Sequence, residues 1–173
     1  MPRAPGAVGF DIETTGVGPD DIVTVACAWS PDAQEHCFYG QDFAAVASML
    51  DRAQCIYTYN GVEFDLPRFA KHCGRSVDAW ALKTVDPLFV MKHAMGYGAC
   101  ARLNDVLQEN GYEPKSGSGL QAIEFWNDGR HEDLRAYCMD DARLTYRLCE
   151  ADEIRWAKKW IVRIREARVL GFQ

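Results

Sequence analysis

Short apolar, β-prone runs dominate the first 40 residues of the chain. Residues 7–13 form the first run, and the turn-forming segment at residues 15–20, with two glycines and a proline, follows it. Residues 22–29 and residues 35–39 predict a second and a third strand. Because short loops join the three runs, the pattern predicts an antiparallel meander.

After residue 40 the spacing of apolar residues changes to that of helices. A helix is predicted over residues 43–53, a fourth strand over residues 55–59, and a helix over residues 66–73 with Pro67 in its first turn. Further elements are expected as a short strand or extended piece at 84–89 and as helices at 103–110, 120–126, 131–150 and 153–169. Strands come first and helices dominate later, which predicts an α/β protein with a mixed sheet.

The last segment of the chain carries its own pattern. Ile154, Ala157, Ile161 and Ile164 lie on one helical stripe, and basic residues cover much of the rest. Residues 152–173 are therefore predicted to form a basic amphipathic helix that closes the domain. A basic surface that guides a nucleic-acid strand and a docking helix for a partner are the alternatives.

Length and composition fit one intracellular, soluble domain over residues 1–173. No apolar run approaches the roughly 20 residues that cross a bilayer, so no membrane association is expected. Seven cysteines without a Cys-x-x-Cys pair fit neither a disulfide framework nor a zinc ribbon. The net charge of −6 is unusual for a nucleic-acid enzyme, but carboxylates that gather divalent cations can bind phosphate through those cations.

Two carboxylates lie in the first predicted strand, in the sequence Gly-Phe-Asp-Ile-Glu-Thr-Thr-Gly at residues 9–16. Residues two apart in a strand point to the same face, so Asp11 and Glu13 project side by side. Two carboxylates this close repel each other unless a cation lies between them, and oxygen ligands suit Mg²⁺ or Mn²⁺. A strand with a solvated polar face gives the same pattern, and the pair alone favours neither interpretation.

A further acidic residue follows the fourth predicted strand, in Tyr-Asn-Gly-Val-Glu-Phe-Asp-Leu-Pro at residues 59–67. Asp65 lies at the junction between this strand and the next helix, and Pro67 is placed to begin that helix. An aspartate at such a junction often caps the helix N-terminus, and the local pattern taken alone favours a cap.

A tyrosine and an aspartate lie one turn apart in the long predicted helix near the end of the chain. Tyr137 and Asp141 share a face with Leu134 and Leu148, so this face points toward the sheet. A carboxylate on such a face needs a partner, because an unpaired buried charge is unfavourable. The neighbouring Asp140 points about 100° away and is expected in solvent.

In this order, the three motifs resemble those of the DEDD exonuclease superfamily. The spacing of Tyr137 and Asp141 is similar to that of the tyrosine branch, DEDDy, because the histidine of the other branch would lie at Ala136. The second motif looks most similar to the exonuclease domains of family B DNA polymerases and related stand-alone predicted exonucleases. The resemblance extends from about residue 8 to 148. It implies an RNase H-like fold with a mixed five-stranded sheet of order 3-2-1-4-5, strand 2 antiparallel, flanked by helices.

The resemblance also implies a reaction. Two divalent cations, Mg²⁺ or Mn²⁺, would serve hydrolysis that releases nucleoside 5′-monophosphates from a single-stranded DNA or RNA 3′ end. The implied metal ligands are Asp11, Glu13, Asp65 and Asp141. Tyr137 completes the implied catalytic set by orienting the attacking water. The implied substrate-binding residues are Thr14, Thr15, Asn60 and Phe64.

Two further alternatives stay open at the level of sequence, beside the choice between DNA and RNA. A catalytically weak or partner-dependent nucleic-acid-binding or proofreading module, working beside a polymerase or another replication or repair protein, is the alternative to an autonomous enzyme. Lys115, in the Gly/Ser-containing segment at residues 115–119, is expected to be a mobile surface lysine, with a phosphate contact as the alternative.

Overall fold

The computed structural model describes residues 6–18, 20–32, 36–39, 43–95, 101–115, 117–157 and 160–163. In chain order the elements are β1 (Ala7–Thr14), β2 (Val23–Trp29), β3 (His36–Tyr39), α1 (Ala44–Arg52), β4 (Cys55–Tyr57), α2 (Asp65–Cys73), α3 (Asp78–Ala81), β5 (Thr84–Val85), α4 (Pro87–Met95), α5 (Leu103–Glu109), α6 (Gly119–Asn127), α7 (His131–Cys149), β6 (Glu153–Trp156) and β7 (Trp160–Arg163). The α/β class is therefore confirmed.

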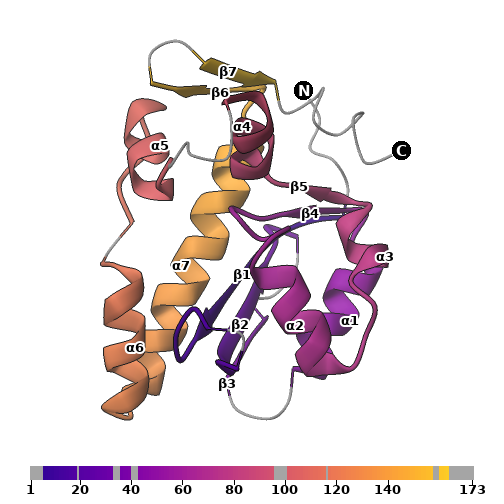
Figure 1. The fold of residues 1–173 in the computed structure, drawn as a ribbon, viewed down its shortest axis with the longest axis vertical. Helices are drawn as coiled ribbons and strands as arrows, with labels where there is room; N and C mark the ends of the chain where they lie inside the picture. The colour runs from indigo at the N-terminus through magenta and orange to yellow at the C-terminus, as the bar shows by residue number, and fades with distance from the viewer. Residues whose placement is uncertain are drawn as a thin grey trace.

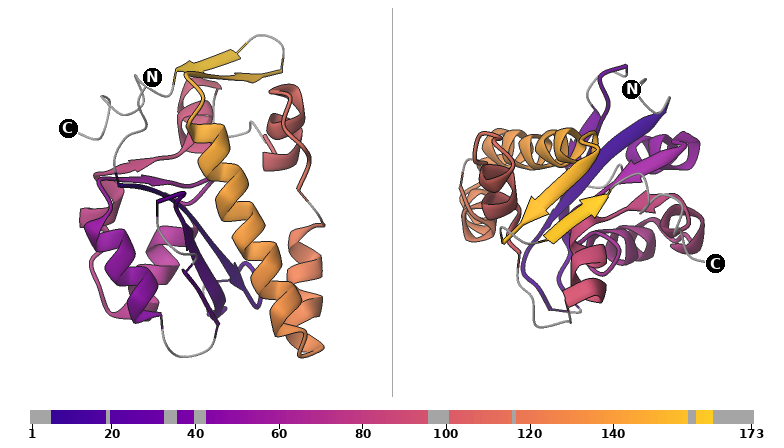
Figure 2. Two further views of the ribbon diagram at one scale, coloured as in Figure 1. Left: turned by 180° about the vertical axis from the view of Figure 1, so that it is seen from behind. Right: turned by 90° about the horizontal axis from the view of Figure 1, so that it is seen from above.

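Five strands form the central sheet in the order β3-β2-β1-β4-β5 (Figure 1). Strand β2 is antiparallel to both of its neighbours, whereas β4 runs parallel to β1 and β5. This is the order and orientation that the sequence resemblance implied. Helices α1 and α2 cover one face of the sheet and α7 covers the other, as the view from above in Figure 2 shows.

Strand β1 is the middle of the fold and divides its side chains between the two faces. Val8, Phe10 and Ile12 join the apolar core beneath α1, α2 and α3. The alternate residues face α7, and there Gly9 permits a very close approach, because a Cβ at this position would lie 2.2 Å from the carbonyl oxygen of Ala142. The sequence of β1 thus sets how near α7 comes to the sheet.

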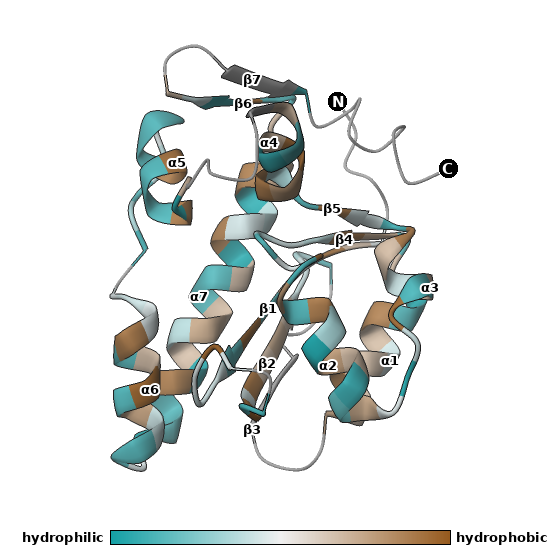
Figure 3. Ribbon diagram, viewed as in Figure 1, coloured by the Kyte–Doolittle hydropathy of each residue, from teal (hydrophilic) through white to brown (hydrophobic). Residues whose placement is uncertain are grey.

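Hydropathy follows these layers (Figure 3). Helices α1, α2 and α7 each carry brown and teal bands, as expected for helices with one buried face. No helix in the described part of the chain is long and apolar enough to cross a membrane. Among the cysteines whose side chains are described, none forms a disulfide.

The segment after β5 differs from the prediction of an extended piece over residues 84–89. Strand β5 has only two residues, and helix α4 begins at Pro87. The carboxylate of Asp86 accepts a hydrogen bond of 3.1 Å from the backbone N–H of Phe89, so Asp86 caps the helix. An Asp-Pro pair followed by apolar residues is a helix start signal that the apolar character of the segment obscured.

The predicted amphipathic helix at the C-terminus is wrong for the residues that the structure describes there. Strands β6 and β7 form an antiparallel hairpin in which Trp156 lies opposite Trp160. Ile154 is buried between the exposed residues Glu153 and Arg155, which is a period of two rather than of 3.6. Tryptophan, isoleucine and valine favour strands when a hairpin can pair them, and this pairing outweighed the helical stripe. Residues 164–173 of the predicted helix lie outside the described residues.

Candidate active site

The alternation of β1 places the first two acidic residues on the face covered by α7. Asp11 and Glu13 follow Gly9 on this face, and both are partly buried. Since α7 contacts β1 closely at Gly9 through Ala142, the adjacent residue Asp141 comes within reach of these carboxylates. The close helix–strand contact is what permits a shared site.

Helix α7 supplies the third carboxylate and the tyrosine. Asp141 is buried with 4% of its surface exposed, and Tyr137 lies one turn before it and is also buried. Carboxylate oxygens of Asp11, Glu13 and Asp141 lie within 4.8 Å of one another. The structure therefore brings together three of the four predicted metal ligands, and Asp140 is directed elsewhere and pairs with Arg143.

Asp65 lies at the edge of this group and is bound differently. It is the first residue of α2 and is buried, and its Oδ1 accepts a hydrogen bond of 3.1 Å from the backbone N–H of Ile12. Strand β4 pairs with β1 only as far as Gly9, so the amide of Ile12 lies beyond this pairing. The residue before α2, Phe64, makes no side-chain capping bond, and Asp65 holds its helix against β1 instead. Its charge is near enough to raise the pKa values of Asp11 and Glu13.

Burial and neighbouring negative charges raise the pKa values of these carboxyl groups. Burial is the largest cause in each case, and the neighbouring negative charges add to it for Asp11 and Glu13. The pKa of Asp11 is well above its ordinary range, that of Glu13 is about 8, and that of Asp65 is about 7. Burial also raises the pKa of Asp141, against the lowering effect of Lys115.

Two oxygens of the group have no partner. Among the described residues, Oδ2 of Asp11 and Oδ1 of Asp141 are buried and accept no hydrogen bond. Buried acceptors of this kind are rare in folded proteins and cost free energy. Clustered carboxylates with unsatisfied oxygens are what hard divalent cations require, so the residues present fit Mg²⁺ or Mn²⁺.

Lys115 is part of this site, which the expectation of a mobile surface lysine did not foresee. Its Nζ donates to Oδ2 of Asp141 at 2.6 Å and to the hydroxyl of Tyr137 at 2.7 Å. Its backbone N–H donates to Oδ1 of Asn104, which anchors the loop. Burial opposes the charged ammonium, but Asp141 outweighs this effect and raises the pKa of Lys115. Neighbouring glycines and serines indicated only a flexible loop, and no local pattern revealed this contact.

The predicted substrate-binding threonines lie at the end of β1 and in the turn that follows it. Thr14 is buried and its hydroxyl donates to the carbonyl of Gly16. The hydroxyl of Thr15 donates to Asp21 at 2.9 Å, and this bond closes the turn. Both hydroxyls thus help to maintain the turn.

The other two predicted substrate-binding residues lie in the loop between β4 and α2. Asn60 and Phe64 are partly buried, and Asn60 has a left-handed backbone with φ of 69°. The guanidinium of Arg68 lies 3.7 Å from the ring centre of Phe64 and donates to the carbonyl of Val17 at 2.9 Å. Arg68 therefore joins this loop to the turn after β1.

Comparison with known proteins agrees with this geometry. The family model described as RNase_H superfamily matches residues 8–151. The chain belongs to the RNase H superfamily. The matched range includes β1 from Val8 onward and the whole of α7, and thus every carboxylate of the site.

A solved structure shows the same RNase H-like fold in a larger protein. The family B DNA polymerase from the hyperthermophilic archaeon Pyrobaculum calidifontis superposes with a TM-score of 0.62 at 22% sequence identity. The match covers 83% of this chain and 24% of the polymerase chain. At this identity the likeness concerns the fold. No curated protein matches the sequence.

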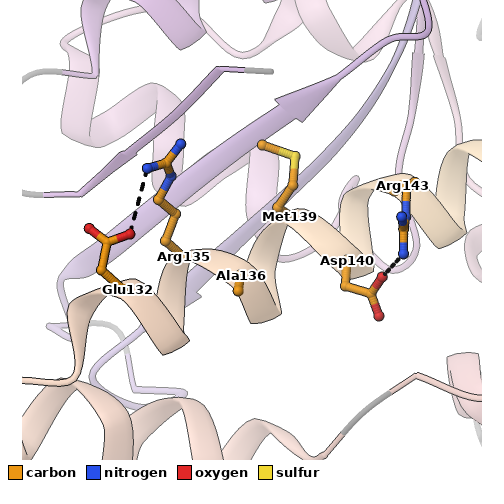
Figure 4. Close-up of a pocket in the computed structure, with 6 residues that line it drawn as sticks. All are labelled: Glu132, Arg135, Ala136, Met139, Asp140 and Arg143. Carbon is orange, nitrogen blue, oxygen red and sulfur yellow. Dashed lines mark hydrogen bonds and ion pairs between the residues drawn. The ribbon is translucent and has the colours of Figure 1, made fainter. Parts of the chain in front are cut away.

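A pocket of about 310 Å³ lies on α7 (Figure 4). None of the four predicted metal ligands is among the residues that line it. Its lining residues are Glu132, Arg135, Ala136, Met139, Asp140 and Arg143. Helical spacing places these residues on the side of α7 opposite Tyr137 and Asp141. Both arginines pair with acidic residues three positions earlier, so the pocket carries no unbalanced charge.

Proposed function

We propose that this domain is a metal-dependent 3′→5′ exonuclease of the DEDDy type that releases nucleoside 5′-monophosphates from single-stranded nucleic acid. One observation carries the proposal. Carboxylate oxygens of Asp11, Glu13 and Asp141 lie within 4.8 Å of one another, and two buried oxygens of this group have no hydrogen-bond partner among the described residues. Membership of the RNase H superfamily and the likeness in fold to a family B DNA polymerase support it.

The acidic residues would hold two divalent cations, Mg²⁺ or Mn²⁺. Asp11, Glu13 and Asp141 provide one set of oxygens, and Asp65, with one oxygen held by the N–H of Ile12, would support a second ion from the edge. When bound, such cations supply positive charge at the scissile phosphate and lower the pKa of the attacking water. Burial raises the pKa values of Glu13 and Asp65, so these groups retain protons more readily in the metal-free protein, and cation binding would displace those protons.

Tyr137 is proposed to orient the attacking water. Burial and the charge of Asp141 raise the pKa of Tyr137, so the phenol stays protonated at neutral pH and cannot act as a base. Lys115 donates to the hydroxyl oxygen, so the phenolic hydrogen points to an acceptor, and Asp141 is one acceptor within its reach. A fixed hydrogen-bond donor beside the reacting phosphate is suited to positioning the attacking water.

The substrate strand is proposed to enter over the two joined loops. Asn60 and Phe64 lie on one loop and Thr14 and Thr15 on the other, and both loops adjoin the ends of β1 and β4. In open α/β sheets ligands bind outside the carboxyl ends of strands, which agrees with this location. The partly exposed ring of Phe64 offers a surface on which a base can stack.

Cleavage of labelled oligonucleotides tests this proposal. Matched single-stranded DNA and RNA with a 5′ label would be incubated with the protein in Mg²⁺, Mn²⁺ or EDTA, beside the Asp11→Ala variant. We expect products that shorten step by step from the 3′ end, that carry the label, and that disappear in EDTA and in the variant. A 3′-blocked strand is the matched substrate control.

Absence of cleavage with either cation and either strand would contradict the autonomous enzyme. Binding without cleavage would favour a partner-dependent proofreading or binding module. The likeness in fold to a DNA polymerase is the observation that favours this second function. The matched region is 24% of the polymerase chain, so in that protein it is one part of a larger molecule. Addition of a polymerase to the same assay would then distinguish a proofreading module, which would cleave the strand, from a binding module, which would not.

A further inference from the structure

The buried carboxylate of Asp86 binds the backbone of the loop between β4 and α2, which carries Asn60. Asp86 is 3% exposed, and its Oδ1 and Oδ2 accept hydrogen bonds of 3.0 Å from the backbone N–H groups of Asn60 and Val62. Between them, Gly61 packs so closely that a Cβ would lie 2.4 Å from Cβ of Thr58. The backbone of Asn60 is therefore held in its left-handed conformation by groups outside the loop.

The side chain of Asn60 is anchored by a second residue of the same region. Lys92, on α4, donates from Nζ to Oδ1 of Asn60 at 2.7 Å and to Oε2 of Glu63 at 2.5 Å. An ammonium group has only donors, so the oxygen of the amide must face Lys92 and the amino group must face away. In the described part of the chain, Nδ2 of Asn60 makes no hydrogen bond.

An amide held in this way presents two N–H donors to whatever lies beside the loop. Phosphate oxygens, sugar oxygens and the carbonyl groups of bases are all acceptors, whereas an outward amide oxygen would repel a phosphate. We propose that Lys92 is a positioning residue that keeps the amino group of Asn60 directed at acceptors of the substrate strand, while Asp86 holds the backbone. This inference rests on the proposed function, because it assumes that a strand lies over this loop.

A direct phosphate contact by Lys92 is the competing role, and the geometry disfavours it. Two of the three ammonium hydrogens are already donated, and the side chain is 18% exposed. The two roles also differ in measurable ways. A positioning residue acts only through Asn60, whereas a phosphate contact contributes on its own and adds to the salt dependence of binding.

A double-mutant cycle on strand binding tests the inference. Affinity for a fluorescein-labelled oligothymidylate would be measured by anisotropy with Ca²⁺ in place of Mg²⁺ or Mn²⁺, and the strand length would be verified afterwards. The proteins are the wild type, Asn60→Ala, Lys92→Met and the double variant. Lys71→Met is the matched control, since it removes the same charge from an exposed lysine that contacts neither Asn60 nor Glu63.

We expect each single substitution to weaken binding about tenfold, and the double substitution to weaken it about tenfold rather than about a hundredfold. Lys92→Arg should retain most of the affinity, since it keeps a donor for Oδ1. Effects that multiply, together with a salt slope smaller by about 0.7, would establish a phosphate contact and overturn the inference. Unchanged binding by Lys92→Met, or no binding by the wild type, would overturn it as well.

Asn60→Asp provides a test that leaves Lys92 intact. The carboxylate keeps an acceptor for Lys92 but replaces the two outward donors by an acceptor, so binding should fall further than in Asn60→Ala. Wild-type affinity of Asn60→Asp would contradict the inference. Failure of the proposed function has a separate signature, namely loss of cleavage in Mg²⁺ and Mn²⁺ while the binding cycle in Ca²⁺ keeps its expected form.

Discussion

Two buried aspartates of this domain, Asp86 and Asp11, have opposite surroundings. Asp86 accepts backbone N–H bonds from Asn60, Val62 and Phe89. Asp11 has an oxygen without a partner among the described residues, and the charges around it are mainly negative. Burial raises the pKa of both carboxyl groups, so the pKa alone does not distinguish them. A carboxylate whose oxygens accept backbone amides stabilises the fold, whereas an unsatisfied carboxylate among like charges has the chemistry that suits a cation ligand.

Loss of activity at Asp11 is the largest effect that this contrast predicts. Asp11→Asn keeps the size of the side chain but removes a charged ligand from the centre of the group. We expect the rate of 3′ cleavage to fall at least about a thousandfold, because the cations that would act on the scissile phosphate depend on this ligand. Single-turnover cleavage of a labelled strand measures it, and a variant with more than about a tenth of wild-type activity would contradict the central role of Asp11.

Stability should respond in the opposite sense at the two aspartates. Asp86→Ala removes the acceptor of three backbone amides, and we expect the free energy of unfolding to fall by about 3 kcal/mol. Asp11→Asn relieves repulsion in the metal-free protein and should raise the free energy of unfolding by about 1 kcal/mol. Urea unfolding in EDTA measures both, and equal destabilisation by the two substitutions would remove the distinction.

Lys115 is the internal cation of the site and should have a smaller effect. Lys115→Met removes the donor to Asp141 and to the hydroxyl of Tyr137, so we expect cleavage to slow about tenfold and the metal-free protein to lose about 1 kcal/mol of stability. Steady-state cleavage and urea unfolding measure the two effects. A Lys115→Met protein with full activity would show that the contact belongs only to the metal-free state.

The pH dependence of stability is the mildest expected effect. Burial and the charge of Asp141 raise the pKa of Glu13 from 4.5 to about 8, so folding strengthens proton binding by this carboxyl group. The stability that it contributes in the metal-free protein is complete below its ordinary pKa and is lost as pH rises from there to about 8. Thermal unfolding of wild type and Glu13→Gln in EDTA should show the advantage of the variant growing with pH across this window. An advantage that shrinks with rising pH would contradict the sign.

The elements that were predicted correctly are those whose patterns are local. Alternation in β1 placed Asp11 and Glu13 on one face, and the spacing of Tyr137 and Asp141 placed them together on the buried face of α7. The resemblance supplied the strand order, which local patterns do not contain. Asp65 was predicted as a ligand, and the structure shows it at the edge of the group, bound to the amide of Ile12.

The features that were missed depend on contacts between distant segments. Lys115 reaches Asp141 from 26 positions away, and Lys92 reaches Asn60 from 32 positions away. Neither lysine lies in a motif, and their surroundings appear only when the chain has folded. The hairpin β6–β7 was missed because its apolar residues satisfy both a helical stripe and a strand alternation, and pairing between the two strands decided the outcome.

Binding of Mn²⁺ to the metal-free protein tests the central claim most directly. Electron paramagnetic resonance of the free ion would be followed during titration of the wild type, Asp11→Asn, Asp141→Asn and, as a control, Lys71→Met. We predict saturable binding by the wild type and the control, and a loss of at least about tenfold in affinity for both aspartate variants. Equal Mn²⁺ affinity in the wild type and Asp11→Asn would show that the carboxylate group is not the metal site, and would contradict the proposed chemistry.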